Sequence, residues 1–226
     1  MEKEVRYYYS LTEENKIIEF LKKINGINYI DKFYEKTIQY DHPSDNNSFY
    51  RKEIDGRFRL RISKGEKENK AMITWKKRLR TVSESEVNTE EEVEVRINPL
   101  DYDNQIYLLE NILKMKKVQS YERYRTIFSN QEIEIAVDHY PFGIALEIES
   151  KLDDSEGDMI IKKWLDILNL DIKDSYKLSW DDKYTELCNK QHIKPSSHVN
   201  FNIKVPYENN LFENVLNMER FKISKC

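Results

Sequence analysis

The sequence predicts an α+β protein in which the β-strands curl into a barrel with a charged interior and helices packed outside. Three observations support this prediction. At least six segments alternate charged and apolar side chains at a spacing of two residues, which sends the two kinds to opposite faces of a strand. The polar face of each segment carries mainly one sign of charge. Finally, the few predicted helices could not cover so many apolar strand faces unless the sheet curls.

Composition limits the class of protein. The chain has 226 residues, 39% of them hydrophobic, so it can bury a core as one large domain. Charged residues make up 35%, yet the net charge is only −4, which argues against a polybasic DNA-binding protein and an acidic disordered chain. Two cysteines are too few for a secreted disulfide scaffold. The charged N-terminus and the lack of a membrane-length apolar stretch predict a cytoplasmic protein without a membrane partner.

The predicted elements are strands with a few inserted helices. A helix over 13–24 follows the opening strand and ends at Gly26. Pro99 opens a second helix, which we expect to run to about 116, with an apolar stripe formed by Tyr107, Leu108, Ile112 and Leu113. The tail from residue 192 is expected to form either a strand over 199–205 with a short helix or a loosely attached extension. The remaining strands cover 29–41, 57–63, 71–80, 89–97, 119–128, 131–138 and 143–150, and the remaining helices cover 156–169 and 180–189.

Each strand places its charged residues on one face. The first strand sets Glu2, Glu4 and Arg6 opposite an apolar face. The charged faces of the later strands comprise Arg57, Arg59 and Arg61; Lys76, Arg78 and Arg80; Glu90, Glu92 and Glu94; Arg123 and Arg125; Glu132, Glu134 and Asp138; and Glu147 and Glu149.

These charged faces have a simple alternative explanation, because an antiparallel sheet with one solvated face also alternates. Solvated faces usually mix Thr, Ser, Gln and Lys, however, whereas these are nearly pure Glu or Arg. We therefore expect the charged faces to line the inside of a barrel, with Glu4, Arg59, Lys76, Arg123 and Glu149 in one enclosed cavity. Such an interior is costly when empty and is explained if it holds a polyanion and its metal ions.

The order and spacing of these motifs resemble the CYTH superfamily, the triphosphate tunnel metalloenzymes, over about residues 1–190. The family's opening Glu-x-Glu-x-Lys corresponds to EKEVR at 2–6, with Arg6 in place of the lysine, and Asn88 stands where an arginine is expected. Further corresponding segments are YDHP at 40–43, FRLR at 58–61, ITWK at 73–76, NTEEE at 88–92, the basic pair Arg123 and Arg125, and EIE at 147–149.

The resemblance implies an eight-stranded antiparallel tunnel over 1–190 that binds a triphosphate, followed by a C-terminal extension over 191–226. It implies Mg²⁺ or Mn²⁺ as cofactor, with metal ligands from the first and last strands. Arg6, although it replaces the lysine, would still bind phosphate. Glu90 or Glu92 would orient the attacking water. The implied metal ligands are Glu2, Glu4, Glu147 and Glu149, and the implied phosphate-binding residues are Arg57, Arg59, Arg61, Lys76, Arg78, Arg123 and Arg125. For each glutamate, a salt bridge to the arginine strands is the alternative role.

Three functions are compatible with such a tunnel. The first is a metal-dependent triphosphatase acting on inorganic triphosphate, a nucleoside or thiamine triphosphate, or an RNA 5′-triphosphate. The second is a class IV type adenylate cyclase, which makes cyclic AMP and pyrophosphate from ATP. The third is a non-catalytic sensor of nucleotides or polyphosphate. The expected partner is therefore a small-molecule triphosphate or nucleotide, or an RNA 5′ end, rather than DNA.

Overall fold

The computed structural model describes residues 2–79, 87–152 and 154–203. The side chains of Glu2 and Arg78, the whole of Arg80, and the tail from 204 to 226 lie outside this description.

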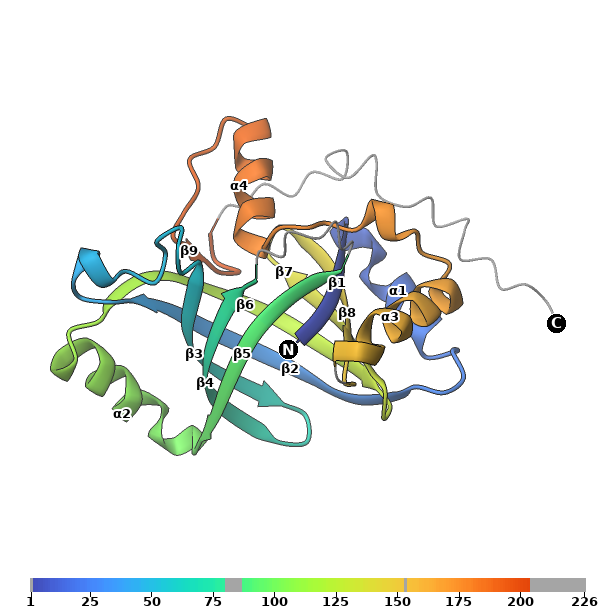
Figure 1. Ribbon diagram of the computed structural model, residues 1–226, viewed down its shortest axis with the longest axis horizontal. Coiled ribbons are helices and arrows are strands. Elements are labelled where there is room, and N and C mark those ends of the chain that lie inside the picture. The colour runs from blue at the N-terminus through green and yellow to red at the C-terminus, as the bar shows by residue number, and fades with distance from the viewer. Residues whose placement is uncertain (1, 80–86, 153, 204–226) are drawn as a thin grey trace.

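The sequence forms a closed eight-stranded antiparallel β-barrel, which confirms the predicted α+β fold (Figure 1). Neighbouring strands pair in the order β2-β3-β4-β5-β1-β8-β7-β6, and β6 pairs back with β2 to close the sheet. The strands are β1 (Glu2–Tyr9), β2 (Asn28–Asp41), β3 (Gly56–Gly65), β4 (Asn69–Arg78), β5 (Asn88–Ile97), β6 (Lys116–Ser129), β7 (Ile133–Tyr140) and β8 (Gly143–Ser150).

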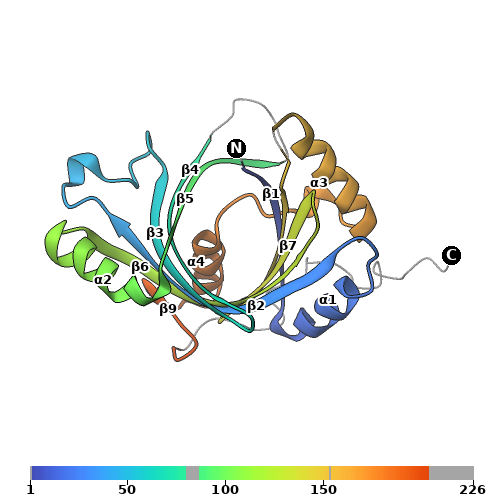
Figure 2. The ribbon, with the colours of Figure 1, turned by 90° about the horizontal axis from the view of Figure 1, so that it is seen from below.

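Two helices cover one side of the barrel and bury the apolar faces of its strands. Helices α1 (Glu14–Leu21) and α3 (Asp154–Leu168) lie side by side outside β1, β7 and β8 (Figure 2). Trp164 and Leu168 of α3 and Ile17 of α1 are almost fully buried in this layer, against strand residues such as Val5 and Ile135. Burying each such side chain stabilises the fold by about 1.5–3 kcal/mol. The apolar faces therefore point outward under the helices, and the charged faces point inward.

The helix predicted over 99–116 is shorter, and its predicted buried face is wrong. Helical turns begin at Pro99 as predicted: a 3-10 turn covers Pro99–Asp101, helix α2 covers Tyr102–Tyr107 and a wider π-type turn covers Leu108–Ile112. The helical segment ends there, and β6 begins at Lys116. The predicted apolar stripe of Tyr107, Leu108, Ile112 and Leu113 is exposed. The side chains that pack on the barrel are instead Tyr102, Ile106 and Leu109.

Helix α4 (Trp180–Lys190) lies at one end of the barrel (Figures 1 and 2). Trp180 packs there against Tyr121 and Tyr140, with ring centroids 4.3 Å and 5.9 Å away. The chain then returns to the sheet as β9 (His198–Val199), which pairs in parallel with β6 beside the stretch that β7 leaves unpaired. The predicted strand 199–205 is not continued over residues 200–203, and its last two residues and the short helix expected after it lie outside the described residues. Val199 is fully buried. In the described part of the chain, no helix is long and apolar enough to cross a membrane.

Candidate active site

A cavity of about 290 Å³ lies inside the barrel. Glu4, Arg59, Lys76, Arg123 and Glu149 all line it, as strand parity predicts. Every predicted site residue whose side chain is described lines this cavity, namely Glu4, Arg6, Arg57, Arg59, Arg61, Lys76, Glu90, Glu92, Arg123, Arg125, Glu147 and Glu149. The volume lies near the lower limit of about 300 Å³ for small-molecule pockets, so the cavity suits a compact ligand.

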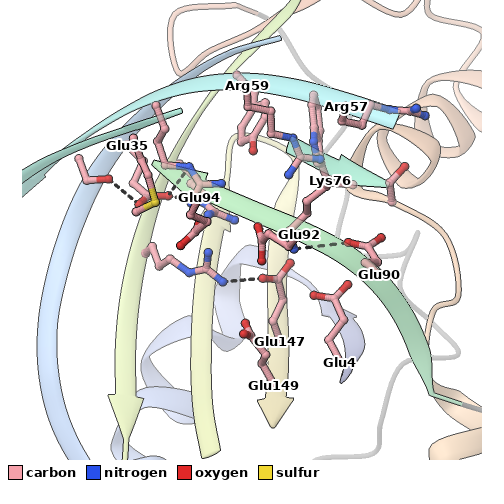
Figure 3. Close-up of a pocket in the computed structure, with 18 of the residues that line it drawn as sticks. Glu4, Glu35, Arg57, Arg59, Lys76, Glu90, Glu92, Glu94, Glu147 and Glu149 are labelled. Carbon is pink, nitrogen blue, oxygen red and sulfur yellow. Dashed lines mark hydrogen bonds and ion pairs between the residues drawn. The ribbon is translucent and has the colours of Figure 1, made fainter. Parts of the chain in front are cut away.

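The lining residues separate by charge into two half-walls. Strands β6, β2, β3 and β4 are consecutive around the barrel and form a cationic half-wall, and β5, β1, β8 and β7 form the facing acidic half-wall (Figure 3). Three residues break this pattern: Glu35 and Asp55 lie among the cations, and Arg6 lies among the carboxylates. The cationic half-wall consists of Arg57, Arg59, Arg61, Lys70, Lys76, Arg123 and Arg125, and the acidic half-wall of Glu4, Glu90, Glu92, Glu94, Glu134, Glu147 and Glu149.

Arg123 is held inside the wall by carboxylates. Its Nε donates to Glu35 Oε2 at 2.7 Å, and its Nη1 donates to Asp138 Oδ2 at 2.6 Å and to the Tyr140 hydroxyl at 3.0 Å. Its side chain is only 3% exposed. Burial would raise the pKa of Glu35, but Arg123 and Arg61 outweigh it and lower that pKa to about 2. Arg123 therefore has a structural role, because it neutralises the buried carboxylates of Glu35 and Asp138.

Glu147 has both carboxylate oxygens occupied by arginines. Arg6 Nε donates to Oε1 at 2.7 Å, and Arg125 Nη2 donates to Oε2 at 2.5 Å. Burial opposes ionisation, but Arg6 and Arg125 hold the pKa of Glu147 well below its usual value. Arg6 also donates to Glu4 Oε1 at 3.0 Å and to the carbonyl oxygen of Leu178 at 3.2 Å. The structure thus places this predicted catalytic arginine in an ion-pair network with two of the predicted metal ligands.

Some guanidinium donors of the cationic half-wall make no hydrogen bond, although Arg61 Nε lies 3.9 Å from Glu35 Oε2. Within the described residues, the buried Nε atoms of Arg59 and Arg61 and Nη2 of Arg123 have no hydrogen-bond partner. Arg59 forms no ion pair with a described carboxylate. A buried donor without a partner costs about 1–3 kcal/mol, more for a charged group, and an anion placed here would remove this cost. These atoms mark the part of the cavity that is ready for an anion.

Arg57 and Lys76 have partners near the other edge of the cationic half-wall. Arg57 Nη1 lies 3.4 Å from Asp55 Oδ1, and its guanidinium carbon lies 4.5 Å from the centre of the Tyr50 ring. Lys76 Nζ lies between the two half-walls, 3.4 Å from Glu90 Oε2 and 3.6 Å from Glu92 Oε1 (Figure 3). These two glutamates, predicted to orient water, therefore lie beside a cation at the boundary of the half-walls.

The acidic half-wall supplies the oxygen ligands that Mg²⁺ and Mn²⁺ prefer. Glu4 is the cross-strand partner of Glu149, and Glu149 is the partner of Glu134, so three carboxylates stand in a row on β1, β8 and β7. Like charges directly opposite each other destabilise a sheet, and a cation would relieve the repulsion. No three acidic side chains of the described residues converge closely enough to form a finished metal site. The donor chemistry fits a divalent cation along this row. Arg6 binds one oxygen of Glu4, whereas both oxygens of Glu147 are occupied by arginines.

Sequence reasoning missed several residues of the site. Glu35 was missed because its strand, β2, mixes aromatic, charged and neutral polar residues and shows no charged face. Tyr121 lines the cavity two residues before Arg123, so the parity of the basic pair would have indicated it. The same parity identified the polar face of Glu134 and Asp138 without assigning either residue to the site.

No family model matches the sequence, and no curated protein matches it significantly. Solved structures do resemble it. The PH1819 protein from Pyrococcus horikoshii OT3 is 22% identical, with a TM-score of 0.60 over 84% of this chain and 99% of that one. A putative adenylate cyclase from Vibrio parahaemolyticus is 17% identical, with a TM-score of 0.54 over 80% of this chain and 96% of that one.

A third similar structure is a putative adenylyl cyclase from Hippeastrum with a dominant triphosphatase activity. It is 15% identical, with a TM-score of 0.54 over 86% of this chain and 98% of that one. At these identities the similarity shows a common fold. The chain therefore shares its barrel, over nearly the full length of each of these proteins, with two putative cyclases and the Pyrococcus protein.

Proposed function

We propose that this protein is a metal-dependent triphosphatase that hydrolyses the terminal phosphate of a triphosphate inside the barrel. The observation that carries the proposal is the facing of a cationic and an acidic half-wall across one cavity. A polyanion alone would need only the cations, whereas a polyanion bound with a metal ion needs both walls. The unpartnered guanidinium donors of Arg59 and Arg61 supply the places where phosphate oxygens would bind.

Substrate binding would fall to the arginines of β3, whose ion pairs with described carboxylates are fewer and longer than those of Arg123 and Arg125. Arg59, Arg61 and Arg57 project from alternate positions of β3 and would bind successive phosphoryl oxygens, while Lys76 would neutralise charge at the boundary with the acidic half-wall. Such fixed donors lower the barrier because they are already oriented before charge develops on the phosphate oxygens.

The acidic half-wall would provide the metal ligands and the water-orienting group. Glu4, Glu149 and Glu134 would hold Mg²⁺ or Mn²⁺, which when bound supplies positive charge to phosphate oxygens. Glu90 or Glu92 would accept a hydrogen bond from the attacking water, because both lie beside Lys76 at the edge where the two half-walls meet. Arg6 would hold Glu4 and Glu147 in position.

The small cavity favours a triphosphatase over an adenylate cyclase. A cyclase must also position the ribose and the α-phosphate of ATP within the site, whereas hydrolysis of a terminal phosphate requires only the triphosphate group to enter. The names of the putative cyclases from Vibrio parahaemolyticus and Hippeastrum keep the cyclase as the second candidate, and the triphosphatase activity named for the latter supports the first.

The test is a product analysis. The protein is incubated with inorganic triphosphate, ATP, thiamine triphosphate or an RNA 5′-triphosphate, each with Mg²⁺, with Mn²⁺ or with a chelator. Release of inorganic phosphate that requires metal is the expected result, and the relative rates identify the substrate. Pyrophosphate formed together with cyclic AMP would instead establish the cyclase. Tight binding without turnover would establish a sensor.

A further inference from the structure

Tyr121 occupies a fixed position in the wall of the cavity. It lies on β6, is 2% exposed and lines the cavity, and its cross-strand partner on β2 is Thr37. Its ring is packed against Trp180 of α4 at 4.3 Å and lies 6.0 Å from the ring of Tyr140 on β7. These contacts leave the ring little freedom, so its hydroxyl is positioned by the fold rather than by a flexible side chain.

The groups that surround Tyr121 are mainly guanidinium groups. Arg59 and Arg61 act on it from β3, and Arg123 acts on it from its own strand. Burial would raise the pKa of Tyr121, but these three arginines, together with the side chain of Thr37, outweigh it and lower that pKa to about 8. The other titratable groups nearby are Tyr140 on β7 and, through Arg59, Asp181 on α4.

The same arginines are the ones that keep unpartnered donors. Nε of Arg59, Nε of Arg61 and Nη2 of Arg123 are buried without a hydrogen-bond partner among the described residues. A phosphate oxygen that satisfies them would sit in the positive field that also surrounds Tyr121. A phenol can donate one hydrogen bond there without adding charge.

We propose that Tyr121 is a substrate-binding residue, whose hydroxyl donates a hydrogen bond to a phosphate oxygen held by Arg59 and Arg61. This inference rests on the proposed function of the cavity as a triphosphate site. The Tyr121 hydroxyl would be a neutral hydrogen-bond donor within the cationic half-wall. The affinity for triphosphate would then depend on whether this hydroxyl is protonated.

Binding of triphosphate beside Tyr121 would also change the protonation of its phenol. A phosphate anion beside Tyr121 raises the pKa of its phenol, since the two negative charges repel each other. Only the protonated phenol donates to phosphate, so above pH 8 the protein takes up a proton when triphosphate binds. At about pH 9 the loss of affinity due to this group alone is about tenfold relative to neutral pH.

The experiment measures binding of inorganic triphosphate by calorimetry from neutral pH to about pH 9, for the wild type and for Tyr121→Phe. The matched control is Tyr124→Phe, which removes the hydroxyl of a half-exposed tyrosine on the opposite face of the same strand. We expect Tyr121→Phe to bind about 3- to 10-fold more weakly at neutral pH, the range typical of one neutral hydrogen bond. The affinity of Tyr121→Phe should also lack the additional decrease above pH 8 that deprotonation of Tyr121 causes in the wild type. Tyr124→Phe should behave as the wild type does.

A second measurement needs no variant. Near pH 8.5 the wild type should show phenolate absorbance from Tyr121. Buried tyrosines such as Tyr8 and Tyr140 should not contribute to it, because burial raises their pKa values well above this pH. Adding triphosphate should reduce this absorbance. Equal affinity and equal pH dependence for Tyr121→Phe and the wild type, or phenolate absorbance that triphosphate leaves unchanged, would overturn the assignment. If the wild type does not bind triphosphate at all, the proposed function itself fails, which is a separate result.

Discussion

Arg6 Nε donates a 2.7 Å hydrogen bond to Glu147 Oε1 and so links β1 to β8 within the acidic half-wall. The same guanidinium binds Glu4 and the carbonyl oxygen of Leu178, two residues before α4. One side chain therefore neutralises two carboxylates and holds the segment that leads to the end of the barrel. A lysine is a single point charge and could not make these three planar contacts at once.

Arg6→Lys should increase the affinity of the protein for Mn²⁺. Arg6 competes with a divalent cation for the carboxylates of Glu4 and Glu147. A lysine at this position would make fewer hydrogen bonds to them, so more carboxylate oxygens would be available to the metal ion. Paramagnetic resonance of free Mn²⁺ during a titration measures this affinity without any substrate. Lys163→Arg, which changes an ion pair with Glu132 outside the barrel, is the control. Equal or weaker Mn²⁺ binding by Arg6→Lys would show that the guanidinium does not compete with metal.

Glu4→Gln and Glu149→Gln should each lower triphosphatase turnover by at least about tenfold, with added Mn²⁺ restoring part of it. The two residues are cross-strand partners, so they would serve the same ion. The double variant should therefore lose much less activity than the product of the two single losses. Glu91→Gln, an exposed residue on β5, should behave as the wild type. Multiplicative losses, or full activity in the presence of a chelator, would show that Glu4 and Glu149 share no catalytic metal.

Much of the barrel was predictable because its interior follows from local alternation. Each strand face is set by the spacing of two residues, and this rule correctly placed Arg59 and Glu149 in one cavity although β3 and β8 lie far apart in the sequence. The alternation rule gives the wrong position for a residue that lies just before a strand begins. The spacing predicts that Glu132 shares a face with Glu134 and Asp138, but Glu132 precedes β7 and accepts a hydrogen bond from Trp164 Nε1 of α3 at 2.9 Å.

The ion pairs inside the barrel could not be predicted, because they depend on how the sheet closes. Arg6 and Glu147 are separated by 141 positions, and only the pairing of β1 with β8 brings them together. Parity states that both residues face inward but not which carboxylate receives which guanidinium. The division of the predicted phosphate-binding residues into committed ones, such as Arg123, and available ones, such as Arg59, is therefore a product of the three-dimensional structure.

Glu35→Gln should change how stability depends on pH in the acid range. The arginines lower the pKa of Glu35 from 4.5 to about 2, so the charged carboxylate stabilises the fold above about pH 4.5 and this contribution disappears as the pH falls through about 2. A shift of this size corresponds to about 3 kcal/mol. Urea unfolding across this range should show a steeper loss of stability in the wild type than in Glu35→Gln. Glu156→Gln, at an exposed position on α3, should follow the wild type. Parallel curves for the wild type and Glu35→Gln would contradict the assignment of this ion pair.

Arg59→Gln should weaken triphosphate binding without lowering stability, whereas Arg123→Gln should lower stability. Arg59 keeps a buried unpartnered Nε and forms no ion pair with a described carboxylate, so its replacement should leave the free energy of unfolding nearly unchanged. It should weaken inorganic triphosphate binding by about 10- to 100-fold, the range expected for a charge-assisted hydrogen bond. Arg123→Gln would leave Glu35 and Asp138 buried without their main cation and should lower stability by about 3–5 kcal/mol. Calorimetric titration and urea unfolding of both variants measure the two quantities. A destabilised Arg59→Gln that binds normally, or a fully stable Arg123→Gln, would show that the division into binding and structural arginines is wrong.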